Sequence, residues 1–194
     1  NGAVYKVTST GAHTLLRSFG GSDGAAPFAG LVADGADNFY GTTFNGGANG
    51  AGTVYKITSA GVHTLLHTFV GINGEAPYAG LVTDGADSFY GTTFNGGANS
   101  RGAVYKVTSA GVYTLLHSFG GSDGEAPFSG LDREGTRLYS SPTFSGRVHA
   151  AGFPQFGGQF DPGRAAPDDD DVDVRLRIEI LAQFGPGKQL EHSE

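Results

Sequence analysis

Cysteine and methionine are both absent from this chain of 194 residues. Without cysteine there can be no disulfide, no thiolate metal site and no cysteine nucleophile, although this absence leaves the redox compartment undecided. The sequence also lacks any run of about 18 uninterrupted apolar residues, which is the length that a membrane-spanning helix requires. We therefore predict a chain without a membrane span.

Positive charge is scarce as well. Lys and Arg number 12 against 19 Asp and Glu, which gives a formal net charge of −7. A protein that binds the phosphate backbone needs a basic stripe to displace counterions, and no cluster of basic residues is present. The composition thus predicts no nucleic-acid partner.

Glycine, by contrast, is abundant, with 34 residues beside an apolar fraction of 38%. The glycines show no every-third-residue spacing of the collagen kind, so they indicate many turns within a chain that can still bury a core. Such a composition is typical of many short strands joined by Gly-rich corners.

A repeat of 50 residues organises the chain. The segment 4–9 (VYKVTS) returns as 54–59 (VYKITS) and as 104–109 (VYKVTS). Repeats of this length are typical of propellers and solenoids, in which stacked copies bury a continuous core. The chain begins within a repeat, from which we expect a longer parent protein.

Each unit contains four strand-like runs separated by turn residues. In the second unit they cover 52–58, 63–69, 78–83 and 88–94, all rich in β-branched and aromatic residues. Four strands in about 50 residues make one blade of a β-propeller. We predict an all-β, propeller-like fold of four-stranded blades, with three clear repeats and a degenerate C-terminal unit. The predicted filling between blades consists of aromatic residues and their equivalents in the later units: Tyr5, Phe19, Phe28, Phe39, Tyr40 and Phe44.

Two short signatures carry a family resemblance. Gly30-Leu31-Val32 precedes Tyr40-Gly41-Thr42-Thr43, and the same pair of motifs recurs 50 residues later. Over about residues 1–131 the chain resembles the GloVer-type bacterial β-propeller tandem repeat family. The resemblance implies a secreted or surface-displayed propeller in which many units stand in tandem, and it supplies no established catalytic residue.

The repeat decays in its third copy. We assign residues 1–144 to the tandem repeats, with the third unit degenerate after 131, and residues 145–194 to a divergent tail. Within that tail, 152–171 is rich in Gly and Pro and predicts a loop. The strict alternation of apolar and charged residues that follows predicts a strand over 172–181.

Three repeats fall short of the four to eight blades of a closed ring. The tail could supply a degenerate fourth unit, with strands in 2–19 completing the last blade. Alternatively, two chains could assemble a larger ring as a homo-oligomer, or the chain could be an open fragment. The sequence leaves these alternatives open.

The pattern G-x-S-x-G occurs twice, at 20–24 and 120–124. In serine esterases and lipases it presents the nucleophile on a strand-to-helix elbow. A hydrolase would use Ser122 or Ser22 as nucleophile, with His117 as base and Asp123 as its orienting partner. We keep this as the alternative function and favour a plain turn, because no helix is predicted to follow and the second unit has Ile-Asn in place of Ser-Asp.

Metal binding is the weaker interpretation of the other polar groups. His13 is replaced by Tyr113 in the third unit and His67 by Arg17 in the first, so packing explains these positions better than ligation. The turn 34–37 and its copy lack the oxygen spacing of a calcium loop. The acidic run 168–171 is typical of a solvated segment. We predict neither a metal site nor a cofactor.

The loops around 20–27 and 45–52 are expected on one face, together with their repeats. Their small polar side chains suit a glycan or another small polar ligand. The leading hypothesis is thus a non-catalytic, extracellular or cell-surface binding module or scaffold. Its candidate binding residues are Ser22, Asp23, Asn45, Asn49, Asn95, Asn99, Ser122 and Asp123.

Overall fold

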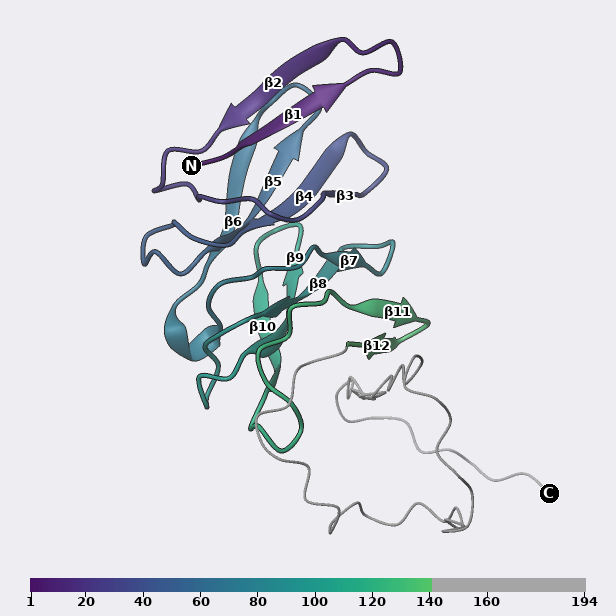
Figure 1. The fold of residues 1–194 in the computed structure, drawn as a ribbon. Helices are drawn as coiled ribbons and strands as arrows, with labels where there is room; N and C mark the ends of the chain where they lie inside the picture. Colours follow the sequence, from purple (N-terminus) through teal and green to yellow (C-terminus); the bar gives the residue numbers. More distant parts are fainter. Residues whose placement is uncertain (141–194) are drawn as a thin grey trace, which may run out of the picture.

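The computed structural model describes residues 1–140 as an all-β chain (Figure 1). The predicted loop 152–171, the predicted strand 172–181 and the end of the degenerate unit lie outside these residues. No helix within residues 1–140 is long and apolar enough to span a membrane.

Twelve strands and one short 3₁₀ helix make up the described part of the chain. They are β1 (Ala3–Val7), β2 (His13–Ser18), β3 (Val32–Ala33), β4 (Asn38–Thr43), β5 (Thr53–Thr58), β6 (His63–Thr68), η1 (Gly71–Asn73), β7 (Val82–Thr83), β8 (Ser88–Thr93), β9 (Ala103–Thr108), β10 (Tyr113–Ser118), β11 (Asp132–Glu134) and β12 (Arg137–Tyr139).

The strands form four antiparallel sheets. Two are four-stranded, with the orders β3-β4-β5-β6 and β7-β8-β9-β10, and two are two-stranded, β1-β2 and β11-β12. The sheets follow one another in chain order from one end of the molecule to the other, with β1-β2 and β11-β12 at opposite ends (Figure 1). Each four-stranded sheet therefore lies between two neighbours.

The predicted grouping of strands into sheets was wrong by half a repeat. We expected the runs 52–58, 63–69, 78–83 and 88–94 to form one blade, yet β5 and β6 pair with the strands before them, and β7 and β8 with the strands after them. The segment between β6 and β7 crosses to the next sheet, whereas the loop between β4 and β5 returns the chain to the neighbouring position in the same sheet. We call β3-β4, β7-β8 and β11-β12 the inner pairs, and β1-β2, β5-β6 and β9-β10 the outer pairs.

The core lies between successive sheets and repeats with them. Val4 and Phe19 of the first sheet pack with Tyr55 and Ile57 of the second. Val54 and Phe69, from the second sheet, belong to a cluster with Tyr105 and Val107 of the third. In the two four-stranded sheets the outer pair thus presents one apolar face to the sheet before it and the other to the sheet after it, which is why these strands show no alternation of polar and apolar residues.

The degenerate inner pair keeps this packing with a shifted register. β11 and β12 form a tight hairpin in which Leu138 lies opposite Arg133, just as Phe89 lies opposite Thr83 in β7-β8. The hairpin is one residue shorter than in the second unit, so Leu138 occupies the place of Phe89. Leu138 is buried against Val104 and Phe119 of the preceding sheet.

Candidate functional site

The two Gly-Ser-Asp-Gly loops are closed turns that follow β2 and β10. Gly21 and Gly24 donate backbone hydrogen bonds to each other's carbonyl groups at 3.1 and 3.2 Å, and Asp23 Oδ1 accepts the N–H of Gly20 at 2.7 Å. The same bonds recur around Asp123, with Gly120 at 2.7 Å. In the second unit η1 takes this place, and Asn73 Oδ1 accepts the N–H of Val70 at 2.9 Å. The acidic or amide side chain at this position therefore ties the loop together in every unit.

A second side chain, from the preceding strand, always reaches this loop. Arg17 Nε donates to Asp23 Oδ2 at 2.9 Å, and the guanidinium and carboxylate form an ion pair. His117 Nε2 lies 2.7 Å from Asp123 Oδ2. The equivalent pair in the second unit joins His67 to an asparagine. What the three units share is a link between strand and loop, and arginine can form that link although it cannot act as a base.

The environment keeps both loop carboxylates ionised. Burial opposes the ionisation of Asp23, but hydrogen bonds from Arg17 and from the Gly20 N–H outweigh it, so the pKa of Asp23 lies below its usual value. Burial likewise acts to raise the pKa of Asp123, but hydrogen bonds from the Gly120 N–H and from His117 outweigh it, so this pKa is also below its usual value. Both groups are therefore carboxylates at neutral pH.

The structure brings together two of the three residues of the hydrolase alternative. A serine triad requires a histidine whose two ring nitrogens face a carboxylate and the serine hydroxyl. His117 contacts Asp123, but within residues 1–140 no hydrogen bond joins Ser122 to His117, and Ser122 is exposed. The loop continues into an extended segment rather than a helix. Ser22 is likewise exposed, and the strand residue that reaches its loop is Arg17.

The predicted binding loops lie against each other. Ala25 and Asn45 exchange backbone hydrogen bonds of 2.8 and 3.0 Å, and the Gly47 N–H donates to the Gly21 carbonyl at 2.8 Å. Glu75 and Asn95 repeat the first pair one unit later. Backbone hydrogen bonds therefore join the two loops, a contact that the sequence analysis did not predict.

The asparagines of these loops divide into two kinds. Asn49 Nδ2 donates to the carbonyl of Phe69 at 3.1 Å, and Asn99 Nδ2 donates to that of Phe119 at the same distance. These amides hold each loop against the end of the following outer pair. Asn45 and Asn95 use their backbone for the loop contacts; the side chain of Asn45 is exposed and that of Asn95 is half-buried.

The histidines and the Asp34 turn take part in packing and turn formation. His63 contacts Phe19 and Tyr55, with ring centroids at 5.9 and 5.6 Å, and burial lowers its pKa. Asp34 accepts hydrogen bonds from the Ala36 N–H, from a side-chain amide and from the Tyr40 hydroxyl at 2.8, 2.8 and 3.0 Å. In the described part of the chain, no three metal-ligating side chains gather in one place.

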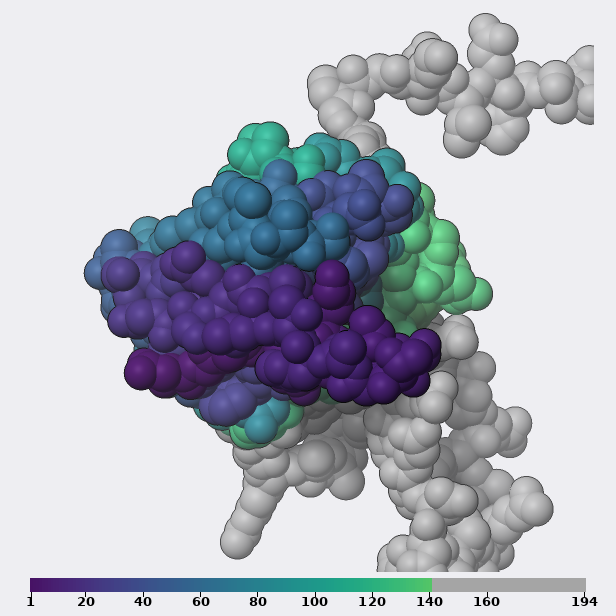
Figure 2. Space-filling model, turned by 90° about the horizontal axis from the view of Figure 1, so that it is seen from above, coloured from purple at the N-terminus to yellow at the C-terminus, as the bar shows by residue number. Residues whose placement is uncertain are grey.

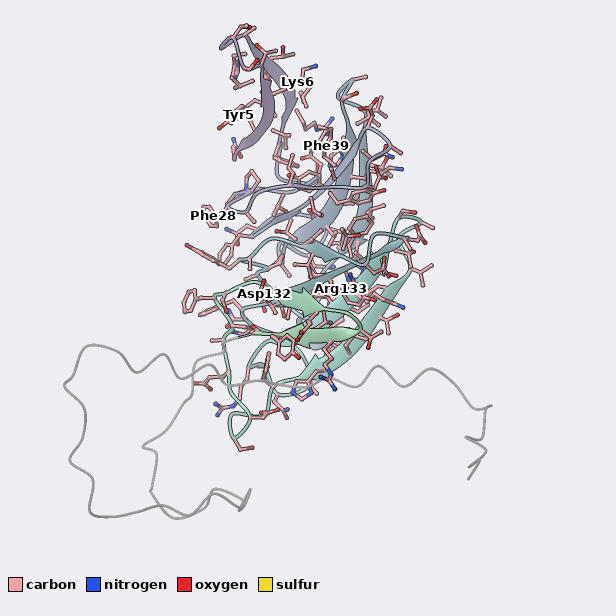
Figure 3. The ribbon with its side chains drawn as sticks, turned by 90° about the vertical axis from the view of Figure 1, so that its right-hand side faces the viewer. Tyr5, Lys6, Phe28, Phe39, Asp132 and Arg133 are labelled. Carbon is pink, nitrogen blue, oxygen red and sulfur yellow. The ribbon has the colours of Figure 1, made fainter. Side chains whose placement is uncertain are left out.

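A row of exposed aromatic rings is the feature that sequence reasoning missed. Phe28, Tyr78 and Phe128 follow a proline in successive units and are 61%, 42% and 52% exposed. Their ring centroids are 5.5 and 5.6 Å apart in sequence order, and Phe44 and Phe94 pack behind them at 5.5 and 4.5 Å. Figure 3 shows Phe28 at the outer margin of the molecule.

This aromatic row corrects one prediction. Phe28 and its equivalents were expected between the blades, but only part of the predicted filling is buried: Phe19 and Tyr40 are, whereas Phe28 is not and Tyr5 is 60% exposed. The identity of an aromatic residue does not show whether its ring is buried between sheets or exposed to solvent. The proline before each of these three residues was the available signal that they differ from the others.

Comparison with known sequence families identifies a match. The sequence model described as the Gloeobacter/Verrucomicrobia repeat matches residues 1–153, which is most of the chain. Among the curated proteins and among the solved structures, none matches.

Proposed function

Because the chain belongs to the Gloeobacter/Verrucomicrobia repeat family, we propose that it is a non-catalytic, propeller-like module that binds carbohydrate outside the cell or on its surface. The all-β repeat architecture fits a module of this kind. Two complete four-stranded sheets, each packed on both faces, support the propeller-like arrangement of blades.

The aromatic row is the observation that carries the carbohydrate proposal. Phe28, Tyr78 and Phe128 expose their rings in a continuous line, and exposed apolar patches are typical of binding surfaces, which supports the proposal. Sugar rings present apolar C–H faces that stack on aromatic rings, and hydroxyl groups at their edges that need polar partners. Asn45 and Asn95 directly follow Phe44 and Phe94, whose rings contact the row, and we propose that these asparagines supply such polar partners.

The row also favours a chain of sugars over a single one. Its three exposed rings come from equivalent positions of three units, so the same contact repeats along the molecule. A ligand that itself repeats can use all three rings at once, and the linked contacts strengthen one another. We therefore expect a polysaccharide or a long oligosaccharide to bind better than its monomer.

A glycan array followed by calorimetry on the best ligand tests this proposal. The triple variant Phe28→Ala, Tyr78→Ala, Phe128→Ala should bind that ligand at least about tenfold more weakly, because the contact area and the stacking are both lost. The double variant Ile72→Ala, Val112→Ala is the matched control, since these residues are 78% and 61% exposed but lie outside the row. Absence of any glycan binding by the wild type, or equal losses in both variants, would refute the proposal.

The location is tested separately from the binding. A tagged form of the natural protein should appear in the extracellular medium or be digested by protease added to intact cells. Protection from protease until the cells are lysed would contradict a surface location while leaving the binding measurement unaffected.

A further inference from the structure

The three rings of the aromatic row do not lie in one plane. The planes of Phe28 and Tyr78 are inclined by 44° and those of Tyr78 and Phe128 by 82°, while the ring centroids are 5.5 and 5.6 Å apart. Figure 2 looks onto the end of the stack that β1 and β2 form, with the later units behind it, so equivalent positions of successive units follow one another along the stack. The row is therefore a line of closely spaced rings whose faces turn from one unit to the next.

A second layer of rings holds this arrangement. Phe44 contacts two members of the row, Phe28 at 5.5 Å and Tyr78 at 5.9 Å between ring centroids. Phe94 contacts Phe128 at 4.5 Å. The two supporting residues directly follow β4 and β8 and are half-buried. Because tilted and edge-to-face contacts between aromatic rings are favourable, this packing fixes the inclination of the exposed rings.

The backbone before each ring adopts a conformation that is uncommon for residues other than glycine. Ala26, Ala76 and Ala126, each followed by the proline that precedes a ring, have φ values of 55°, 56° and 46°. The carbonyls of Ala26 and Ala76 accept the N–H groups of Phe44 and Phe94 at 3.0 Å. Such strained residues persist where the surrounding structure fixes them, and they cluster at sites that hold ligands. Their recurrence beside the row is a second, independent indication of a binding site.

The segments that lead into the three rings carry negative charges and no positive ones. Segments 20–29, 70–79 and 120–129 contain no Lys or Arg, and their acidic residues are Asp23, Glu75, Asp123 and Glu125. Asp23 and Glu125 form ion pairs with arginines of other segments, whereas Glu75 is exposed three residues before Tyr78. A polyanionic chain along the row would meet like charges, which costs binding free energy. The row therefore suits an uncharged ligand.

Glucans built from the same sugar differ in the shape that their linkages impose. Linkages between equatorial positions alone, as in cellulose, set successive sugar rings nearly in one plane, so the chain is a flat ribbon. An axial bond at each linkage, as in amylose, inclines successive sugar rings and coils the chain. Coplanar aromatic rings would suit the ribbon, whereas rings inclined by 44° and 82° suit the coiled chain.

On the premise that the row binds carbohydrate, as proposed above, we infer that it selects an uncharged, coiled glucan chain of the amylose type, with neighbouring sugars of one chain on neighbouring rings. The turn between the ring faces disfavours flat cellulose chains, and the acidic segments disfavour polyanionic chains. Phe44 is a positioning residue, because it contacts two of the exposed rings and sets their inclination.

Calorimetry with two hexasaccharides tests the preference on the complete chain. Maltohexaose and cellohexaose contain the same sugar and have the same length, so they differ only in the linkage. Maltohexaose should bind at least about tenfold more tightly than cellohexaose. The protein is the same in both titrations, so the folding of a variant does not enter this comparison. In affinity electrophoresis, soluble amylose should retard the protein more than carboxymethylated amylose does.

Protein variants locate the preference to the row. Tyr78→Ala, which removes the middle ring, should weaken the binding of maltohexaose at least about tenfold. Phe44→Leu keeps an apolar side chain behind the row but removes the supporting ring, and it should bring the affinities for the two hexasaccharides closer together. Val112→Ala is the control, since this side chain is 61% exposed at a hairpin of the third sheet, and it should change neither affinity. Circular dichroism verifies that the variants are folded.

The outcomes separate this inference from the proposed function. Equal affinity for the two hexasaccharides, tighter binding of cellohexaose, or an unchanged affinity ratio in folded Phe44→Leu would overturn the preference for a coiled glucan. Binding of some other glycan alone, lost in the triple variant, would do the same while leaving the carbohydrate function intact. Absence of binding by every glycan would instead sink the proposed function, and this inference with it.

Discussion

The contact between Gly91 and Tyr105 allows a quantitative test of sheet pairing. Gly91 lies opposite Tyr105 in the β8-β9 ladder, and its Cβ position would be 2.5 Å from the tyrosine hydroxyl oxygen and 3.0 Å from Leu81 Cδ2. Tyr105 is fully buried, so its ring has no room to move away. Overpacking of this kind costs about 1–3 kcal/mol of unfolding free energy. We expect Gly91→Ala to lower the stability by this amount.

The hydroxyl group of Tyr105 supplies the second half of the test. It finds no hydrogen-bond partner among the described residues although it is buried. Removing an unsatisfied buried polar group is nearly neutral or stabilising, so Tyr105→Phe should leave the unfolding free energy unchanged or raise it. In the double variant the closest clashing atom is gone, while the ring carbon Cζ at 2.7 Å stays. We therefore expect Gly91→Ala to cost less unfolding free energy in the Tyr105→Phe background than in the wild type, with a coupling energy of about 1 kcal/mol.

Urea unfolding followed by circular dichroism measures all four proteins of this cycle. Gly71→Ala is the control, because nothing lies within 4 Å of the added Cβ at that position, and its effect should stay within about 0.5 kcal/mol. The pairing of β8 with β9 would be refuted if Gly91→Ala were as mild as the control, or if Tyr105→Phe failed to relieve any of its cost.

Three further predictions concern individual side chains. His63 is half-buried and desolvation lowers its pKa, so its contribution to stability is complete above about pH 6.5 and is lost as the pH falls further. His63→Tyr, which introduces the residue that the third unit has at this position, should reduce the loss of melting temperature between about pH 7 and 5. An unchanged pH profile would contradict this. The pKa of Asp23 is lowered by Arg17 and backbone N–H groups despite burial, so the wild type loses stability as this carboxylate is protonated below about pH 4. In acid unfolding, Asp23→Asn should therefore lose less stability than the wild type between neutral pH and about pH 3. Leu138 is buried in the place of Phe89, so Leu138→Ala should cost about 2–5 kcal/mol in urea unfolding, and a cost below about 1 kcal/mol would show that the degenerate hairpin does not cover the third sheet.

The sequence predicted the strands better than their assembly into sheets. The runs of β-branched and aromatic residues locate β5, β6 and β8 within a residue or so, because local propensity and turn chemistry act over a few residues. A sequence that repeats every 50 residues, however, does not show where one sheet ends and the next begins. Which four strands share a sheet depends on which loops join strands of the same sheet and which cross to the next one. This is a long-range property of the fold.

The sequence also predicted only some features of the candidate site. The sequence analysis expected the loops around 20–27 and 45–52 on one face of the molecule, but it did not predict the backbone hydrogen bonds between Ala25 and Asn45. The hydrolase alternative already paired His117 with Asp123, and the structure places these two side chains in contact. The pairing of Arg17 with Asp23 was not predicted, since the partners lie on different elements and only the fold sets their distance. The exposure of Phe28 is also a property of the assembled stack, because it depends on how the extended segment before β3 lies against the next unit.

Disulfide formation between engineered cysteines tests the central claim, that each complete sheet combines halves of two consecutive repeats. The natural chain has no cysteine, so any cross-link comes from the introduced pair. Ser88 and Thr108 lie opposite each other in the β8-β9 ladder and belong to different repeats, and Cα atoms of directly paired antiparallel residues lie within the range that a disulfide spans. The variant Ser88→Cys, Thr108→Cys should form this disulfide on mild oxidation, detected by mass spectrometry, whereas Thr58→Cys, Ser88→Cys, two strand ends of the same repeat, should not. A disulfide in the second variant and none in the first would contradict the account.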